Sequence, residues 1–278
     1  MAVPTHEPAH VVNGDSVAGT LALPGEVIVW RDVLHEGAIP PGDAATVCRA
    51  RAAFLSAAGC GEEGEIMAGL AAADAALLAA LADGRETVLW FEHDLHDQLQ
   101  LIQILARIAE HPARSSARLI MVDRFPGHER FAGLGELSAD ELATLWPGRR
   151  EIAGAAFAVA VHAYEVLRSG DAVALAAFAA EAHPSLPFLA PALRRLLEER
   201  PWSGPGPGRG ERQILRAVAA GARTPGEVFA ATWQMEEAPY MGDTWLWRRI
   251  DELVAAEPPL LTRASGRLEL TAEGRAEL

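Results

Sequence analysis

The stretch "TVLWFEHDLHDQLQLIQIL", residues 87–105, decides the fold class of this chain. Its first five residues, Thr87–Phe91, are β-branched, aliphatic or aromatic, which is typical of a short buried strand. A polar segment follows, and then Leu99, Ile102 and Leu105 recur at nearly helical spacing. A buried strand that leads directly into a helix with one apolar face predicts a unit of an α/β sheet.

The same alternation extends on both sides of this stretch. Further strand-like segments are His10–Val12, Val27–Val33 and Arg118–Val122. The helical patterns between strands are Gly42–Gly59, Gly64–Gly84 and Asp94–His111. Strands that alternate with helices predict a mainly parallel sheet with flanking helices, which we assign to an α/β Rossmann-like domain over residues 1–137.

The second half of the chain has a different pattern. Residues 138–200 have helical patterns throughout, beginning with a Ser-x-x-Glu capping box in "SADELATLW". The Pro- and Gly-rich segment "PWSGPGPGRG", residues 201–210, predicts a linker. Residues 211–278 contain three helical patterns, the second with Thr224 as N-cap and Pro225 at its first position, and then a strand, a turn and a strand. This order is typical of a winged-helix-like domain.

Composition excludes several classes of protein. The formal net charge is −14, and all 24 basic residues are arginine, so a Schiff-base lysine and a Gly-Lys-Ser phosphate loop are absent. The two cysteines, Cys48 and Cys60, have neither disulfide-framework nor metal-site spacing. We find no basic n-region at the N-terminus and no apolar run of about 18–20 residues, so we expect a cytoplasmic protein that does not bind membranes.

Polar residues gather directly after the four predicted strands. In a parallel sheet these carboxyl ends lie on one edge, where α/β folds bind ligands. Because carboxylates and imidazoles can exchange protons, the candidate catalytic residues are Asp15, Ser16, Asp32, His93, Asp94 and Asp97. The candidate ligand-binding residues are Asn13, Gly14, Arg31, Glu92, Gln98, Asp123 and Arg124.

Each of these residues also has a purely structural explanation. Asp94 and Asp97 suit the N-cap and first turn of the helix that follows them, and Asp15 suits another N-cap. Arg31 and Asp32 are adjacent and could form a surface ion pair. What helix capping does not explain is that polar residues recur at all four strand ends. We therefore expect Asp15, Asp32 and Asp94 to converge near one pocket that binds a small molecule, with a divalent metal as a candidate cofactor.

Two resemblances to known families bear on this site. "NGDS", residues 13–16, resembles the opening block of the GDSL/SGNH hydrolases, in which the serine is the nucleophile. Their Asp-x-x-His spacing occurs here at Asp32–His35, much earlier in the chain than in that family, and their Asn block is absent. A hydrolase or transferase that acts on a small, phosphorylated or nucleotide-like molecule is the activity we expect from this edge.

A second resemblance covers more of the chain. The blocks "HVVNGDSVAGTL", "VWRDVLHEG" and "LWFEHDLHDQLQLIQIL" resemble, in this order, a bacterial family catalogued as domain of unknown function 1835, over about residues 9–130. The segments "APYMGD" and "LTAEGRAEL" resemble the tail that often accompanies it. The resemblance implies a fold, and no reaction or catalytic residue comes with it.

The C-terminal domain leaves two alternatives open. A winged helix could make the protein a ligand-sensing transcriptional regulator, yet residues 211–278 hold eight arginines against eleven acids, and DNA readers carry clustered basic faces. Trp245 and Trp247 beside Arg248 and Arg249 predict instead a helix that packs against the α/β domain or a second copy of the chain. We therefore expect a protein-interaction module or a homo-oligomer before a nucleic-acid binder.

Overall fold

The computed structural model describes residues 6–109, 111–199, 202, 204 and 206–278. Its contacts divide the chain into two compact units, Met1–Leu193 (unit 1) and Arg194–Leu278 (unit 2). The division falls within α8, Leu189–Leu197, and the linker expected over residues 201–210 stays a prediction. Residues 201, 203 and 205 of that expected linker lie outside the described residues. The helical region expected as a separate segment, 138–200, belongs to unit 1 as far as Leu193.

Unit 1 is built on one mixed sheet of five strands. Its spatial order is β2-β1-β3-β4-β5, in which the first four strands are parallel and β5 is antiparallel to β4. The strands are β1 (Ala9–Val12), β2 (Glu26–Val29), β3 (Thr87–Glu92), β4 (Ala117–Val122) and β5 (Arg150–Glu151). The expected mainly parallel α/β sheet is therefore confirmed.

The strand register brings the polar segments to one edge. Val12 at the end of β1 pairs with Val29 on one side and Trp90 on the other, and Glu92 at the end of β3 pairs with Val122. All four parallel strands therefore end on the same side of the sheet. This confirms that "NGDS", "WRD", "EHD" and "VDR", which follow or complete these strands, begin at a common edge.

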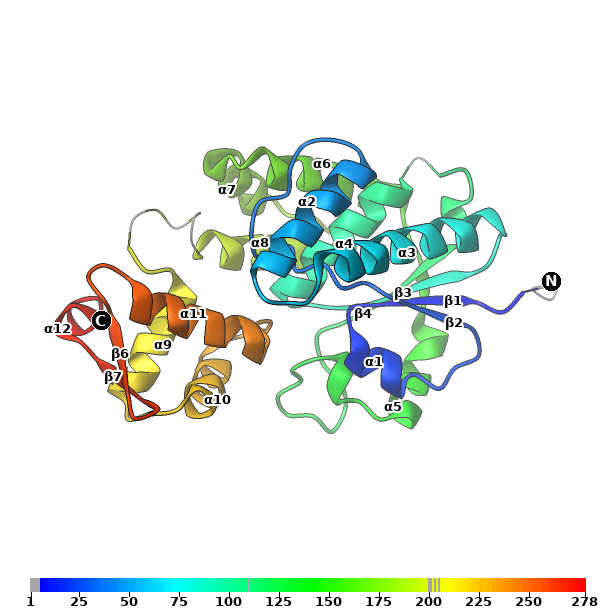
Figure 1. Cartoon of the computed structure of the whole chain (residues 1–278). Coiled ribbons are helices and arrows are strands. Elements are labelled where there is room, and N and C mark those ends of the chain that lie inside the picture. Colours follow the sequence, from blue (N-terminus) through cyan, green and yellow to red (C-terminus); the bar gives the residue numbers. More distant parts are fainter. Residues whose placement is uncertain (1–5, 110, 200–201, 203, 205) are drawn as a thin grey trace. The chain divides into compact units, whose positions relative to one another are not determined.

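Helices cover both faces of the sheet (Figure 1). On one face lie α1 (Asp15–Thr20) and α5 (Ala139–Leu145), and on the other lie α2 (Ala44–Ala57), α3 (Glu63–Ala82), α4 (Leu95–Ile108) and α6 (Gly154–Ser169). Unit 1 also holds α7 (Ala172–Ala180) and three short 3-10 turns, η1 (Arg114–Ser116), η2 (Leu134–Glu136) and η3 (Trp146–Gly148).

Side-chain alternation explains how one sheet supports two cores. Val88 and Trp90 of β3 join one cluster of buried residues with Leu142 of α5 and Val17 of α1. The predicted apolar face of α4 is confirmed, since Leu99, Ile102, Leu105 and Ile108 are fully buried. A strand buried on both faces has no polar alternation, which is why β3 appears in the sequence as a continuous apolar run.

Two segments differ from the sequence-based expectation. The strand expected over Val27–Val33 ends at Val29, and an irregular loop follows it. The fully buried guanidinium of Arg51 holds this loop by donating hydrogen bonds to the carbonyl oxygens of Val33, Glu36 and Ala38. Arg150–Glu151, expected to begin a helix, pairs instead as β5 with the open edge of β4. Unpaired strand-edge groups need hydrogen-bond partners, and a two-residue strand supplies some of them.

Unit 2 consists of helices and one β-hairpin. Its elements are α9 (Arg209–Ala219), α10 (Pro225–Met235), α11 (Asp243–Ala255), β6 (Leu261–Ala264), β7 (Arg267–Leu270) and α12 (Ala272–Ala276). Strands β6 and β7 are antiparallel, and α9, α10, α11 and the hairpin share one buried apolar cluster. The predicted N-cap is confirmed, because the Thr224 side chain accepts a hydrogen bond from the Glu227 amide and Pro225 follows it.

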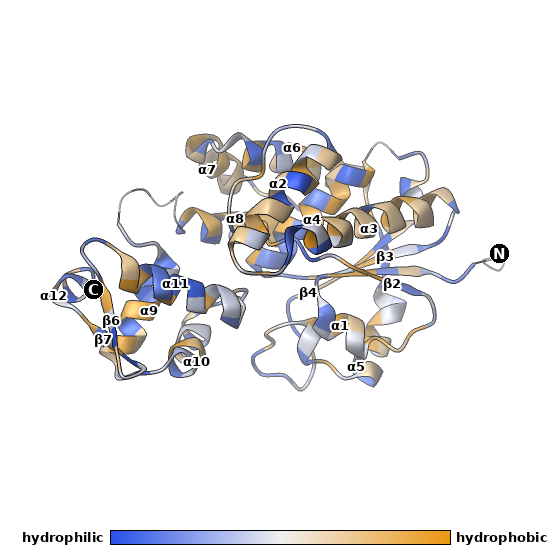
Figure 2. Cartoon of the chain, viewed as in Figure 1, coloured by the Kyte–Doolittle hydropathy of each residue, from blue (hydrophilic) through white to orange (hydrophobic). Residues whose placement is uncertain are grey.

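Helix α3 is unusually apolar for its exposure. The most apolar 18-residue stretch of this 20-residue helix has a mean hydropathy of 1.7. By length and composition alone, the helix could cross a membrane. Glu65 and Asp74 interrupt the apolar residues of α3, so this helix contains no uninterrupted apolar run of about 18–20 residues. Figure 2 shows apolar colours along most of α3, although only Leu77, Ala80 and Leu81 are buried.

Candidate functional site

The site lies where the direction of strand addition reverses. The chain passes from β1 outward to β2, returns past β1 to β3, and continues to β4 on the other side. The switch point of this open sheet is therefore between β1 and β3, and ligands of such sheets bind outside the strand ends at that point. Asn13, directly after β1, donates a side-chain hydrogen bond to the Asp97 carboxylate in the first turn of α4, across the switch point.

The turn from β3 into α4 is held by its own acids. Asp94 is the N-cap of α4 and accepts from the Asp97 amide at 2.9 Å. Asp97 in turn accepts from the Glu92 amide at 2.8 Å, and the Gln98 side chain donates to the Glu92 carbonyl at 2.6 Å. The capping explanation for Asp94 is therefore right, and it places three carboxyl groups at one strand end. We call Glu92, Asp94 and Asp97 the acidic cluster.

Burial makes the acidic cluster electrostatically unusual. Burial raises the pKa of Asp94 to about 7, against two backbone hydrogen bonds that lower it. Burial, then the charges of neighbouring members, raise the pKa values of Glu92 and Asp97 well above those of ordinary carboxyl groups. No ion pair joins the cluster to a cation in the described part of the chain. Uncompensated buried carboxylates are costly, so the cluster retains protons near neutral pH.

Glu92 is enclosed by a glycine that sequence analysis did not single out. A Cβ on Gly133, whose φ is +149°, would lie 2.0 Å from the Glu92 Oε2 atom. That oxygen is buried and has no hydrogen-bond partner. Gly133 is therefore required both by its backbone conformation and by the approach of the carboxyl group. No local sequence signal distinguishes it from the other glycines of this loop.

His93 follows Glu92 directly at the end of β3 and packs among aromatic rings. Its ring stacks on Phe131 with centroids 6.5 Å apart and meets the edge of Phe188 at 6.0 Å. Burial lowers the pKa of His93, with the charge of Asp123 opposing the shift, and its buried Nδ1 has no hydrogen-bond partner. Next to β1, a Cβ built on Gly14 would meet nothing within 4 Å, so space lies open above the chain there. The His93 imidazole is therefore partly buried among aromatic rings, and Asp123 is the charged group that acts on its pKa.

Asp32 belongs to a different polar group. Its carboxylate is nearly fully buried and pairs with the Arg51 guanidinium at 2.8 Å, while its carbonyl accepts from the Gln100 side chain at 2.7 Å. Burial lowers the pKa of His96 beside it to about 4. Sequence analysis missed Arg51, although a signal was present: it falls at four-residue spacing between Val47 and Leu55, the buried stripe of α2.

The remaining predicted residues lie at the surface. Asp15 pairs with Arg31 at 2.5 Å and Asp123 with Arg124 at 2.8 Å, and the members of the first pair are 76% and 55% exposed. Ser16 is exposed, and no histidine among the described residues hydrogen-bonds to it. Asp15, Asp32 and Asp94 therefore have three different environments, and of these three only Asp32 lines a cavity of about 1080 Å³ among the helices of unit 1.

Metal ligation finds no support in this geometry. No group of three or more histidine, cysteine, aspartate or glutamate side chains among the described residues is arranged to hold a metal ion. The acidic cluster uses its oxygens for backbone amides and the Asn13 amide instead.

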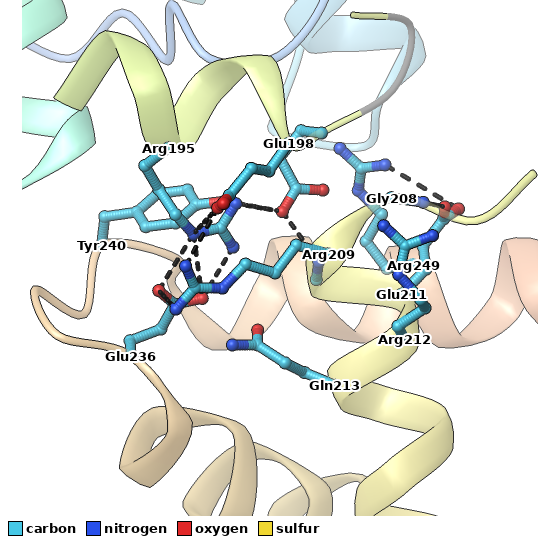
Figure 3. Close-up of polar contacts among 12 residues, drawn as sticks. Arg195, Glu198, Gly208, Arg209, Glu211, Arg212, Gln213, Glu236, Tyr240 and Arg249 are labelled. Atoms are coloured by element: carbon cyan, nitrogen blue, oxygen red, sulfur yellow. Dashed lines mark hydrogen bonds and ion pairs between the residues drawn. The ribbon is translucent and has the colours of Figure 1, made fainter. Parts of the chain in front are cut away.

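Unit 2 also buries charged side chains, and there Arg195 and Glu236 lie together (Figure 3). The Arg195 guanidinium pairs with Glu199 at 2.6 Å and with Glu236 at 2.6 Å, and lies 5.1 Å from the ring of Tyr240. Although burial opposes it, the hydrogen bond to Glu236 and the charges around it raise the pKa of Arg195. We call Arg195, Glu199, Glu236 and Tyr240 the arginine network, and its mutual compensation marks it as structural.

Comparison with known proteins adds nothing to this geometry: no protein-family model, no curated protein and no solved structure matches the chain.

Proposed function

We propose that unit 1 is a small-molecule hydrolase or transferase whose proton-transfer site is the acidic cluster with His93, at the switch point between β1 and β3. The observation that carries the proposal is that Glu92, Asp94 and Asp97 are buried together without a cation. Strongly perturbed carboxyl groups at a ligand-binding edge are a signature of functional sites, because a fold gains no stability from them.

Asp94 and His93 supply complementary proton carriers. With a pKa of about 7, Asp94 holds a proton that it can donate near neutral pH. His93, whose pKa is lowered by burial, is neutral under the same conditions and can accept one. Environments that move neighbouring pKa values in opposite directions assign the acid and the base. We assign Asp94 as the general acid and His93 as the general base.

Ser16 has no role in the proposed chemistry. A nucleophilic serine needs a base within hydrogen-bond reach, and no such bond is present in the described residues. The acceptor in a hydrolysis would then be water activated by His93, which requires no covalent intermediate. This departs from the mechanism implied by the GDSL/SGNH resemblance.

The charge at this edge favours a neutral or cationic ligand that is rich in hydroxyl or amino groups. The nearby guanidinium groups of Arg31 and Arg124 are already paired with Asp15 and Asp123. A phosphorylated ligand would meet the acidic cluster without a free arginine to offset its charge. We therefore place phosphate esters below neutral esters and glycosides as candidate substrates.

The test is hydrolysis of p-nitrophenyl acetate and p-nitrophenyl glycosides, with p-nitrophenyl phosphate as the charged comparison. Asp94→Asn keeps an N-cap residue, so the fold should remain, and we expect the rate to fall by about 10²–10⁴-fold. The parent rate should decline above about pH 7, as Asp94 loses its proton. Unchanged turnover by both Asp94→Asn and His93→Gln would refute the assignment.

The resemblance to domain of unknown function 1835 remains part of this proposal as a fold assignment for residues 9–130. It is consistent with the parallel order of β1, β2 and β3, since its three blocks fall on these strands and their polar ends. It supplies no activity.

For unit 2 we propose a winged-helix module that binds protein and not DNA. The observation that favours it is on α11, the helix that would enter a DNA groove: Arg249 is buried with its Nη1 4.0 Å from the Glu211 carboxylate, and Arg248 pairs with Glu252 at 3.0 Å. Trp247 on the same helix is 44% exposed. Guanidinium groups held by carboxylates offer few phosphate contacts, whereas an exposed tryptophan is a common anchor for proteins.

Duplex-DNA affinity of the full chain across a salt series tests this second candidate. We expect weak binding with a shallow salt dependence, since each neutralised phosphate contributes a slope of about −0.9. Tight, sequence-selective and steeply salt-dependent binding would favour a transcriptional regulator instead.

A further inference from the structure

We propose that the 1080 Å³ cavity of unit 1 binds an amphipathic small molecule with an apolar body and one anionic head, such as a medium-chain carboxylic acid. The cavity lies among α2, α3, α4 and α6, and its polar end is at Trp30–Asp32, directly after β2. It uses none of the residues of the acidic cluster, so it stands independently of the proposed acid–base chemistry.

The walls of the cavity are apolar and hollow because small residues line them. Seven alanines from three helices and the C-cap of α4 face it: Ala44, Ala45, Ala68, Ala71, Ala73, Ala106 and Ala109. A Cβ-only side chain gives an apolar surface without filling the space between helices. The cavity is at the upper end of the range of about 300–1,000 Å³ that is usual for ligand pockets, so it suits a sizeable small molecule.

Helix α3 shows that this apolar surface lacks a partner within the described chain. Its buried residues are Leu77, Ala80 and Leu81, all near its C-terminal end. Met67 and Leu70, in its first half, line the cavity, and Met67 is 40% exposed. An apolar ligand would remove this surface from water, which is the main driving force for such binding.

Polar groups converge at one end of the cavity. Trp30 Nε1 donates to Gln103 Oε1 at 2.7 Å, which orients the Gln103 amide so that its Nε2 donates to the Tyr164 hydroxyl at 3.4 Å. Because the Tyr164 oxygen accepts this hydrogen bond from Gln103, the Tyr164 O–H proton is available to donate. No acceptor for that proton is found among the described residues. A ligand head that accepts hydrogen bonds would complete this chain.

Arg168 supplies a positive charge at the same end. Its guanidinium lies 5.4 Å from the ring of Tyr164 and donates to the carbonyl oxygens of Pro40 and Gly42. Carbonyl oxygens orient the guanidinium without neutralising it, and no carboxylate within ion-pair distance of Arg168 is found in the described chain. Its charge is therefore available to an anion.

The charge of the lining as a whole contrasts with that of the chain. Four arginines and three carboxylates line the cavity, in a protein with a formal net charge of −14. Arg107 is paired with Asp74, while Asp32 pairs with Arg51 and Arg31 with Asp15, both partners lying outside the lining. Arg49 and Arg168 then remain against Glu165. The excess of positive charge selects an anionic head over a cationic one.

Calorimetric titration of the full chain tests the ligand class with three probes of equal chain length. Dodecanoate is expected to bind, dodecanol to bind about ten- to a hundredfold more weakly, since it lacks one charge-assisted hydrogen bond, and dodecyltrimethylammonium more weakly still. Because Trp30 lines the cavity, its fluorescence should change with the same affinity. Absence of dodecanoate binding below its critical micelle concentration would overturn the proposal. Equal affinity for the alcohol would overturn the anionic head.

Filling the cavity gives a matched test of its place. Ala71→Phe, or Ala106→Phe on the opposite wall, should abolish dodecanoate binding, whereas Ala72→Phe should not, because Ala72 is exposed on α3 outside the lining. Circular dichroism and thermal unfolding check that each variant is folded. If both filled variants still bound dodecanoate, or if Ala72→Phe lost binding to the same extent, dodecanoate would not bind in this cavity and the proposal would be wrong.

Variants at the polar end test the head group. Tyr164→Phe and Arg168→Gln should each weaken dodecanoate about tenfold or more and leave dodecanol within about twofold. Asp94→Asn should leave dodecanoate affinity as in the parent, so failure of the acid–base site and failure of this cavity are distinguishable. A concentration-dependent dimer that dodecanoate dissociates would assign the cavity to a second copy of the chain and overturn the small-molecule proposal.

Discussion

The arginine network of unit 2 and the acidic cluster of unit 1 bury carboxyl groups in opposite ways. In unit 2 the carboxylates of Glu199 and Glu236 both meet Arg195 at 2.6 Å. In unit 1 the acidic cluster meets only amides and its own members, and burial raises the pKa of Asp94 to about 7. A guanidinium compensates the two carboxyl groups of the arginine network, whereas no cation among the described residues pairs with the acidic cluster, and burial raises the pKa values of its carboxyl groups.

This difference separates two kinds of buried charge within one chain. A compensated buried ion pair is commonly structural, and losing one partner is destabilising because the other charge stays buried. An uncompensated cluster lowers the stability of the ionised protein, and its retention at a ligand-binding edge indicates function. Four measurements test whether the arginine network and the acidic cluster differ in this way.

The largest expected effect comes from opening the arginine network. Arg195→Met keeps the length of the side chain but leaves Glu199 and Glu236 without their guanidinium. We expect the free energy of unfolding of unit 2 to fall by about 3–5 kcal/mol. Urea unfolding of the full chain measures it, with Arg216→Met on an exposed position of α9 as the control, expected within about 0.5 kcal/mol. A small loss for Arg195→Met would show that the network is dispensable.

The pH dependence of unit 1 should show the opposite sign from an ordinary salt-bridged acid. Because the folded pKa of Asp94 is raised from about 4 to about 7, the unfolded chain releases its proton first, and stability falls as pH rises between these values. Asp94 alone should contribute about 2–4 kcal/mol to this decline. Asp94→Asn should reduce the decline, measured by urea unfolding from pH 4 to 8.

The control for this titration is another helix N-cap. Asp171→Asn changes the N-cap of α7, which is exposed to solvent, and should leave the decline as in the parent. An unchanged pH dependence in Asp94→Asn would mean that the cluster does not hold its protons as we infer.

A smaller effect is expected from two neighbouring arginines of α11. Arg249→Gln removes a cation beside the fully buried Glu211 and should cost about 1–3 kcal/mol. Arg248→Gln removes an exposed pair with Glu252, four residues along the helix, and should cost about 0.3–0.5 kcal/mol. Equal losses in thermal or urea unfolding would contradict the distinction between inward and outward arginines on this helix.

The smallest expected effect concerns Trp247 on α11. The sequence predicts that Trp245 and Trp247 pack against the α/β domain or a second copy of the chain; within the single chain Trp245 is buried and Trp247 is 44% exposed. Trp247→Ala should therefore change the free energy of unfolding by no more than about 0.5 kcal/mol. A loss above about 2 kcal/mol that depends on protein concentration would show that a second copy covers Trp247.

The parallel sheet, and the edge at which polar residues gather, could be predicted from the sequence. Apolar runs such as Thr87–Phe91, each followed by polar residues, require strands buried on both faces, and the helices between them require parallel crossovers. Asn13, Glu92 and Asp97 could be assigned to one edge for this reason alone, because the carboxyl ends of parallel strands are on the same side. The N-caps at Asp94 and Thr224 were predictable because their hydrogen bonds span three residues of sequence.

The partners of those edge residues could not be predicted from the sequence, because they come from other elements of the fold. Asp32 is matched by Arg51, which lies nineteen positions away, while Asp15 is matched by Arg31 at the surface. Glu92 is enclosed by Gly133 from a distant loop, and the cavity arises where alanines of separate helices face one another. Local patterns fix the type and direction of an element, but ionisation and enclosure depend on distances between elements, which a periodic pattern does not contain.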